Sequence, residues 1–275
     1  MIPNTLTIAG VDPSGGAGIL ADIKAMSALG AYGTAVVAAL TAQNTLGVTD
    51  IAPVAPGFVA RQIDTLFSDV RIDAVKIGML GQQPVTRVVA ERMAHWKPVH
   101  LVLDPVMIAK SGDALLEREA IDELRESLVP LATLITPNLP EAGVLLDSRP
   151  VETLKEMRGV AERLRRLLAD DGRRWVFLKG GHLPGNDTID LLHDGDRMIE
   201  LPGTRIATKN THGTGCTLSA ALAALLPQSG DVPEAAQRAK AYLVEAIARS
   251  DQLEVGFGHG PVHHFHAWWN TANRL

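Results

Sequence analysis

The segment 210–225, NTHGTGCTLSAALAAL, joins a glycine-rich turn to the start of a predicted helix. The first backbone N–H groups of a helix lack partners within it and carry partial positive charge. Gly213 and Gly215 let an anion approach this backbone closely. The pattern favours an anion hole that holds a phosphoryl group, although a tight turn with Thr214 as the helix N-cap fits it too. Cys216, the only cysteine in the chain, stands in this turn.

Further polar residues follow short apolar runs. Asp104 comes after HLVL, and Lys179 comes after WVFL and before two glycines. A lysine in that position is well placed to neutralise a nucleotide phosphate. The segment 136–141, TPNLPE, fits a helix capping box between Asn138 and Glu141, and the same pair could orient Mg²⁺ through water. The two interpretations are compatible.

Two other segments are weaker signals. The loop 10–18, GVDPSGGAG, lies between a predicted strand and a predicted helix, but it lacks the spacing of a dinucleotide-binding fingerprint. No P-loop motif occurs in the chain. Near the C-terminus, PVHHFHAWW interleaves His263, His264 and His266 with large apolar residues, which favours a docked tail over a metal site.

Short apolar runs alternate with amphipathic segments along the chain. The predicted strands are 6–9, 35–40, 74–77, 101–103, 133–135 and 175–178, and 189–201 reads as a hairpin around Asp194-Gly195. The predicted helices are 19–29, 56–67, 83–95, 121–128, 153–169, 214–226 and 232–252. This alternation predicts an α/β fold whose mostly parallel sheet is covered by helices on both faces. Ligands of such folds bind at the carboxyl ends of the strands, where the polar residues above gather.

Composition narrows the class of protein. The 275 residues fit a single domain, residues 1–275. One cysteine fits a reducing compartment, and we expect a cytoplasmic protein because the start lacks the features of a signal peptide. No apolar stretch is long enough to span a membrane. The formal charge of -5, with no basic run, makes nucleic acid an unexpected partner.

Together these segments resemble the hydroxymethylpyrimidine/phosphomethylpyrimidine kinases of thiamine biosynthesis, which belong to the ribokinase-like superfamily. The resemblance runs nearly from end to end and rests on AGVDPSGGAGILADIKAMSALGAYG, TAQNTLGV, VKIGML, LDPVMIAKSG, ITPNLPEA, LKGGH, TKNTHGTGCTLSAALAA and EVGFGHGPVHHFHAWW. It implies a three-layer ribokinase-like sandwich that phosphorylates 4-amino-5-hydroxymethyl-2-methylpyrimidine to its monophosphate and then to its diphosphate. It also implies ATP, Mg²⁺ and a homodimer.

The resemblance implies a role for each site residue. Gln43 would hydrogen-bond the aminopyrimidine, which suits an amide that donates and accepts at once. The same pocket would be lined by Gly10, Ala17, Asp22, Met79 and Val106. Asn138 and Glu141 would serve the Mg²⁺-phosphate site, with Asp104 near it. Lys179 would contact the ATP phosphates, Thr211 would lie on the nucleotide side, and Gly213, Thr214, Gly215 and Cys216 would form the anion hole.

The wider superfamily carries an aspartate base where this chain has Cys216. A phosphate monoester has a second pKa of about 6, so the second substrate is mostly a dianion that needs no base and would be repelled by a carboxylate. A thiol, with a pKa of about 8.5 that a helix N-terminus lowers, would be neutral for that step and still accept a proton from the alcohol. Packing of a small apolar side chain is the alternative explanation of the cysteine.

Three rival functions stay open at this point. A pyridoxine or pyridoxal kinase shares the fold and the chemistry. A cysteine hydrolase would use Cys216 with His212, although no spacing in the sequence indicates an acid partner. A pyrimidine-binding sensor would bind the ring without consuming ATP.

Overall fold

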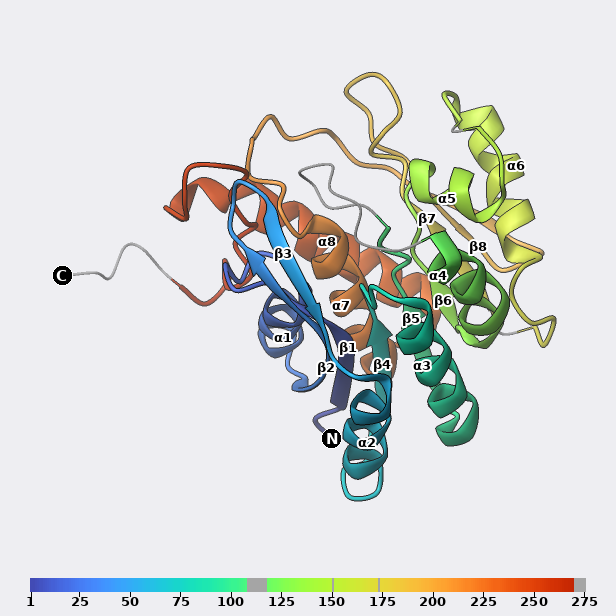
Figure 1. Cartoon of the computed structure of the whole chain (residues 1–275). Coiled ribbons are helices and arrows are strands. Elements are labelled where there is room, and N and C mark those ends of the chain that lie inside the picture. Colours follow the sequence, from blue (N-terminus) through green and yellow to red (C-terminus); the bar gives the residue numbers. More distant parts are fainter. Residues whose placement is uncertain (108–117, 150, 173, 270–275) are drawn as a thin grey trace.

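The computed structural model describes residues 1–107, 118–149, 151–172 and 174–269. One nine-stranded sheet runs through them in the order β3-β2-β1-β4-β5-β6-β7-β8-β9 (Figure 1). Its strands are β1 (Asn4–Val11), β2 (Tyr32–Gln43), β3 (Val48–Pro53), β4 (Ala74–Ile77), β5 (His100–Leu103), β6 (Leu134–Ile135), β7 (Trp175–Leu178), β8 (Asp190–His193) and β9 (Met198–Leu201).

Six neighbouring strands, in the order β2-β1-β4-β5-β6-β7, pair in parallel, and antiparallel strands lie at both edges of the sheet. On one edge β3 folds back on β2, and on the other β8 and β9 form the hairpin that Asp194-Gly195 predicts. The mostly parallel sheet of the sequence analysis is therefore confirmed. Because the central strands are parallel, their carboxyl ends share one edge, and the loops that follow them can build one site.

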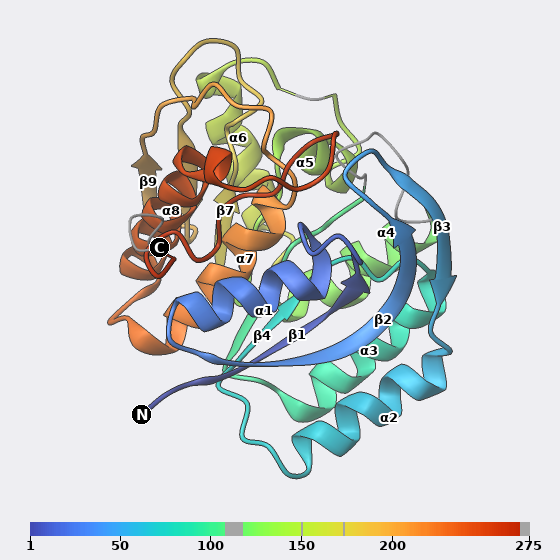
Figure 2. The same ribbon diagram turned by 90° about the vertical axis from the view of Figure 1, so that its left-hand side faces the viewer.

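Helices cover both faces of the sheet. They are α1 (Gly18–Ala28), α2 (Pro56–Phe67), α3 (Gln83–Trp96), α4 (Arg118–Glu123), α5 (Leu139–Leu145), α6 (Leu154–Arg165), α7 (Thr214–Leu225) and α8 (Val232–Ala248). Figure 2 looks onto the face that α1, α7 and α8 cover. The remaining helices pack on the opposite face, so the molecule has the three layers of a ribokinase-like sandwich.

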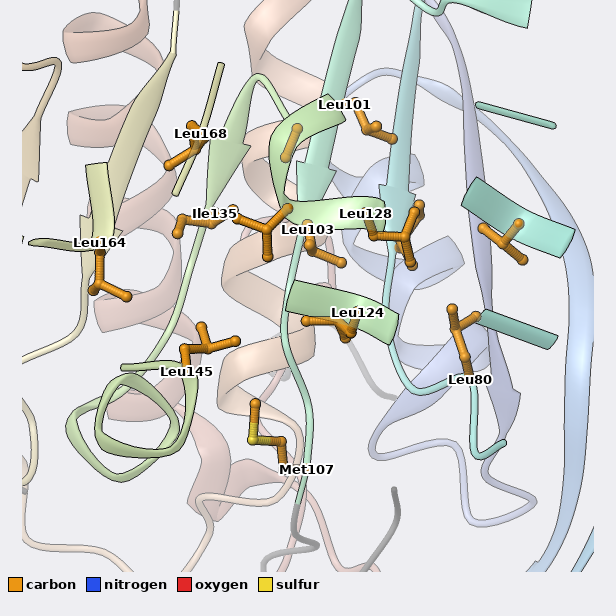
Figure 3. Packing of buried hydrophobic residues seen from close by; sticks show 14 of the residues in the cluster. Leu80, Leu101, Leu103, Met107, Leu124, Leu128, Ile135, Leu145, Leu164 and Leu168 are labelled. Carbon is orange, nitrogen blue, oxygen red and sulfur yellow. The ribbon is translucent and has the colours of Figure 1, made fainter. Parts of the chain in front are cut away.

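Alternate residues of the strands feed the two hydrophobic cores. Val102 and Phe177 point to the layer of α1, α7 and α8, whereas Leu103 and Ile135 join the larger core on the other face. Figure 3 shows that larger core, in which Leu124 and Leu128 meet side chains from β5 and β6. This core needs few aromatic residues, because the small alanine side chains of α7 let the helix pack close to the sheet.

The sequence misses some boundaries. All six predicted strands exist, but β2 is longer than residues 35–40, and β3 was not predicted. The segment predicted as helix 121–128 starts at Arg118 and turns into a π-helical turn over Leu124–Leu128, and helix α6 ends at Arg165 instead of residue 169. The N-cap of α7 is Gly213, at φ 75°, and not Thr214, which is the first helical residue. That position needs a positive φ, which glycine adopts without strain.

Candidate active site at the carboxyl edge of the sheet

Three charged side chains meet where β5, β6 and β7 end. Asp104, only 1% exposed, accepts hydrogen bonds from Thr136 Oγ1 at 3.0 Å, Lys179 Nζ at 3.1 Å and Ser219 Oγ at 3.2 Å. Lys179 Nζ also lies 3.8 Å from Glu141 Oε2. The structure thus brings together Asp104, Glu141 and Lys179, as the sequence predicts for residues that follow neighbouring parallel strands.

The ammonium of Lys179 reaches the start of helix α7. A Cβ atom placed on Gly215 would lie 3.4 Å from Lys179 Nζ and 3.5 Å from Asp104 Oδ2. Glycine at 215 therefore leaves the helix N-terminus open beside a cation. Asp104 and Glu141 raise the pKa of Lys179 above its ordinary value, against the opposing effect of burial, so the lysine stays charged. An exposed backbone with a fixed cation beside it is an arrangement that suits a phosphoryl group.

Glu141 is the least compensated charge of this group. Burial raises the pKa of its carboxyl to about 7, and Asp104 adds to the effect, whereas Lys179 opposes it. The capping box predicted from TPNLPE is present: the Asn138 N–H donates to Glu141 Oε2 and the Glu141 N–H donates to Asn138 Oδ1, each at 2.8 Å. The cap fixes the position of Glu141, so the structural interpretation of this pair is confirmed.

A buried His-Asp pair ties two loops of the site together. His212 Nε2 lies 2.7 Å from Asp12 Oδ2, and Asp12 also accepts hydrogen bonds from the N–H groups of Ser14 and Ala17. The imidazole lies directly against Gly16, where a Cβ atom would be 2.2 Å from His212 Cδ2. Hydrogen bonds from His212 and Ser14 lower the pKa of Asp12, although burial opposes them. The loop 10–18, a weak signal in the sequence, is thus organised around Asp12.

The contact between His212 and Asp12 argues against the rival function of a cysteine hydrolase. No spacing in the sequence indicates an acid partner for His212, and the structure supplies one in Asp12. That contact holds the imidazole between two loops, and no hydrogen bond links His212 to Cys216 among the described residues. Burial raises the pKa of the Cys216 thiol to about 11, so the thiol is almost entirely protonated near neutral pH. The expectation that the helix N-terminus lowers this pKa was wrong, because desolvation and the nearby Asp22 and Asp104 outweigh Lys76 and a hydrogen bond from the Gly18 N–H.

Asp22 does not lie where the sequence analysis expects it. Its side chain is completely buried and accepts hydrogen bonds from Lys76 Nζ at 2.8 and 3.0 Å and from Thr7 Oγ1 at 2.6 Å. A carboxylate without exposed atoms cannot line a ligand pocket directly. Lys76, its partner, was missed, although a lysine inside the apolar strand AVKI must find a buried counter-charge.

The remaining predicted residues lie around the ends of β1, β2, β4 and β5. The Gly10 N–H donates to the Met79 carbonyl at 3.0 Å, and a Cβ atom on Gly10 would lie 2.7 Å from Met79 Cε. Ala17, Val106 and Gln43 are partly exposed, and Thr41 Oγ1 donates to Gln43 Oε1 at 3.1 Å. Gln43 thus ends β2 at the same edge of the sheet as the charged group.

A C-terminal strap, residues 256–261, joins the β2–β3 turn to the turn that precedes α7. The His259 N–H donates to the Thr45 carbonyl at 3.0 Å, and the His212 N–H donates to the Gly260 carbonyl at 3.0 Å. Figures 1 and 2 both show the red C-terminal segment reaching the tip of the blue hairpin. The sequence analysis predicts a docked tail but not this connection between the two turns. Thr211, expected on the nucleotide side, lies next to it and is partly exposed.

The tail docks through buried histidines, as predicted. His263 and His264 are 2% and 4% exposed, and His264 Nε2 lies 3.0 Å from Thr217 Oγ1 of α7. Burial lowers the pKa of His264 to about 3, so its imidazole is neutral. Over the ranges described above, no three His, Cys, Asp or Glu side chains come together as metal ligands.

The fold and the site define a class. A pyridoxal kinase of Bacillus subtilis, solved as an ADP complex, superimposes with a TM-score of 0.88 at 33% identity, covering 98% of this chain and all of that one. A phosphomethylpyrimidine kinase of Clostridium difficile 630 superimposes with a TM-score of 0.78 at 39% identity, covering 89% of this chain and 99% of that one. The structure is therefore that of a ribokinase-like kinase.

Sequence comparison narrows the class to one family. The family model described as phosphomethylpyrimidine kinase matches residues 12–263. The hydroxymethylpyrimidine/phosphomethylpyrimidine kinase of Escherichia coli strain K12 is 54% identical over 268 residues, 97% of this chain and 98% of that protein. This chain belongs to the phosphomethylpyrimidine kinase family and is a phosphotransferase. No helix within the described residues is long and apolar enough to cross a membrane.

Proposed function

We propose that this chain transfers a phosphoryl group from ATP to 4-amino-5-hydroxymethyl-2-methylpyrimidine, and then a second one to the resulting monophosphate, for thiamine diphosphate synthesis. The observation that carries the proposal is the placement of the Lys179 ammonium at the open N-terminus of α7, beside Gly215. Phosphoryl transfer passes through a loose transition state, so positioning and charge stabilisation supply most of the catalysis. Family membership supports the pyrimidine as the acceptor.

In this proposal the phosphoryl group lies on the backbone N–H groups of Gly213 to Cys216, and Lys179 stabilises the charge that develops on it. Asp104 holds the Lys179 ammonium in place, and Thr136 and Ser219 hold Asp104. Thr211 and Asn138 lie on the nucleotide side. Gln43 pairs with the amino group and ring nitrogen of the pyrimidine, and Gly10, Ala17, Met79 and Val106 shape the surface around the ring.

The residues present fit a magnesium ion carried by the nucleotide. Mg²⁺ keeps several waters and needs only one or two carboxylates when phosphate oxygens complete its shell. Glu141 offers a buried carboxylate with a raised pKa, which a cation would stabilise in its charged form, whereas Asp104 is already bound by Lys179, Thr136 and Ser219. Glu141 and Asn138 would hold the ion, with Asp104 behind them, and the ion would neutralise charge on the phosphates.

In the second step Cys216 is present as a neutral thiol. Its pKa of about 11 leaves it protonated near pH 7, so it does not repel the dianionic monophosphate. In the first step the thiolate, a minor form at this pKa, takes the proton of the alcohol and becomes the thiol as the alcohol oxygen attacks the phosphoryl group. The charge argument for a cysteine in place of the superfamily's aspartate thus applies to the second step, in which no proton has to be accepted.

We also propose a cytoplasmic homodimer. Leu40 and Leu46 of the β2–β3 hairpin are 52% and 68% exposed, and apolar side chains gathered on an edge hairpin suit a subunit interface. Light scattering coupled to size-exclusion chromatography would report the mass in solution, and a monomer at micromolar concentration would refute the dimer.

The second candidate function is phosphorylation of pyridoxal, favoured by the superposition on the Bacillus subtilis enzyme. A coupled ADP-release assay would compare hydroxymethylpyrimidine, its monophosphate, pyridoxal and pyridoxine, each with and without Mg²⁺. We expect turnover of both pyrimidines at a kcat/KM well above that of pyridoxal. Turnover of pyridoxal alone would replace the proposal, and pyrimidine binding without ADP release would indicate the sensor.

A further inference from the structure

Two of the buried charges, Lys76 and Asp22, have no part in the proposed function so far. Both side chains are 0% exposed, and their atoms are 2.8 Å apart. Replacing a buried ion pair by apolar residues is often neutral or stabilising, so stability alone does not explain why the sheet holds one here. Gly78, at the carboxyl end of β4, leaves room for the amine: a Cβ atom there would lie 2.6 Å from Lys76 Nζ.

The pair lies close to the start of α7, which carries the thiol. Gly18 begins α1, and this start packs directly against the start of α7, since a Cβ atom on Gly213 would lie 3.2 Å from the Ala17 Cα. Asp22, four residues later, lies on the same face of α1 one turn further along, because residues i and i+4 of a helix are neighbours on its surface. The Lys76 ammonium bound to Asp22 is therefore close enough to Cys216 for its charge to act on the thiol.

The charges that act on the thiol come from four elements of the fold. Asp22 comes from α1, Lys76 from β4, Asp104 from the end of β5 and Lys179 from the end of β7. Lys76 makes removal of the thiol proton easier, whereas Asp22 and Asp104 make it harder, and burial raises the pKa most. Asp22 also neutralises much of the charge of Lys76.

We propose that the buried Lys76–Asp22 pair is a positioning device for the reaction, in which the Lys76 ammonium favours negative charge on Cys216 and Asp22 limits that effect. Lys76 touches no substrate and acts only through the cysteine. The consequence for catalysis rests on the proposed function, since only the alcohol of the first step gives up a proton. The effect on the thiol does not rest on it.

The lone cysteine makes the test direct. Alkylation by iodoacetamide, followed by mass spectrometry between pH 7 and 11, reports the thiolate fraction of Cys216 alone. In Lys76→Met the lost cation should slow alkylation at pH 9 about tenfold, and in Asp22→Asn the freed cation should speed it about tenfold, since each change moves the thiol pKa by about one unit. Lys240→Met is the matched control, because Lys240 is also largely buried and paired with Asp190 at 2.8 Å, yet it lies outside the site.

Opposite shifts in the two variants, with the control unchanged, would support the inference, because loss of structure would speed alkylation in both. Circular dichroism and thermal unfolding would show that each variant is folded. A folded Lys76→Met protein that reacts at the wild-type rate or faster would overturn the inference. If that variant does not fold, an unchanged rate in Asp22→Asn overturns it.

A kinetic comparison separates this inference from the proposed function. Lys76→Met should slow the hydroxymethyl step several-fold more than the monophosphate step. If the alkylation rates shift as expected but Lys76→Met slows the hydroxymethyl step and the monophosphate step by the same factor, the charge coupling is supported and the proton-accepting role of Cys216 is refuted.

Discussion

The two halves of the carboxyl edge are built in different ways. Around the ends of β5, β6 and β7, side chains hold one another through charge, as in Asp104, Glu141 and Lys179. Around the ends of β1 and β2, apart from the Asp12–His212 pair, backbone groups hold one another, as between Thr45 and the strap or between Gly10 and Met79. The first half offers fixed charges, whereas the second offers a shaped surface that includes the side-chain amide of Gln43.

This difference matches what each half is proposed to bind. A phosphoryl group changes its charge distribution during transfer, and preorganised charges stabilise it without rearranging. A neutral pyrimidine ring needs close apolar contact and a few placed hydrogen bonds. Substitutions on the charged half should therefore act on turnover, and substitutions on the backbone-built half should act on pyrimidine affinity and stability.

Lys179→Met should give the largest effect. The loss of a preorganised charge at the transferring group should lower kcat about 10²–10³-fold, with the pyrimidine Kd changed less than threefold. Steady-state kinetics and calorimetry would measure the two quantities. Lys155→Met, which removes an exposed lysine of α6, is the control and should leave both unchanged. A wild-type kcat in Lys179→Met would show that the fixed charge of this half does not contribute to turnover.

Glu141→Gln should change the pH dependence of stability. The folded-state pKa of Glu141 is raised to about 7 from its ordinary value of 4.5, so its favourable contribution is complete below about pH 4.5 and is lost as pH rises through 7. A shift of this size corresponds to at most about 3 kcal/mol. The variant should therefore gain stability relative to wild type between pH 5 and pH 8, measured by urea unfolding. A stability difference that does not vary with pH would show that Glu141 is ionised throughout.

The sequence predicts the charged half better than the other half. Asp104 and Lys179 directly follow apolar strands, Asn138 and Glu141 lie a few residues after another, and parallel strands must bring such residues to one edge. Lys76 was missed because its partner Asp22 lies 54 residues away on α1, and nothing local links them. The raised pKa of Cys216 was missed for the same reason, since burial depends on tertiary packing.

The half around the ends of β1 and β2, built mainly from backbone contacts, is harder to predict from the sequence. Strand β3, VTDIAP, has too few apolar residues for a strand prediction, and it forms because β2 offers it an edge. The strap depends on contacts between residues more than 200 positions apart, as between Thr45 and Gly258. The glycines of the strap can be read from the sequence, but the contacts that require glycine there depend on the fold.

Gln43→Ala should weaken pyrimidine binding by about 1–3 kcal/mol, because the ring's donor and acceptor lose their partner. The ATP KM should stay near the wild-type value. Calorimetry with hydroxymethylpyrimidine, in parallel with ATP kinetics, would measure this split. Equal losses for both ligands would show that Gln43 serves the structure of the β2 end, where Thr41 donates to it, and not the ring.

Gly258→Ala should have the smallest effect on turnover and act through packing. A Cβ atom at 258 would lie 2.0 Å from the Thr45 carbonyl oxygen and 2.9 Å from the Leu46 nitrogen, both backbone atoms that cannot rotate away. The strap must shift away from the hairpin, at a cost of about 1–3 kcal/mol, and the Tm should fall by several degrees. Because Thr45 is two residues from Gln43, the pyrimidine KM should rise by less than tenfold while kcat stays within twofold. Gly159→Ala is the matched control: nothing lies within 4 Å of the added methyl group, and alanine should raise stability slightly within α6. If Gly258→Ala lowers kcat as strongly as Lys179→Met does, the strap sets the phosphoryl-transfer geometry itself, and the division between a charged and a shaped half does not hold.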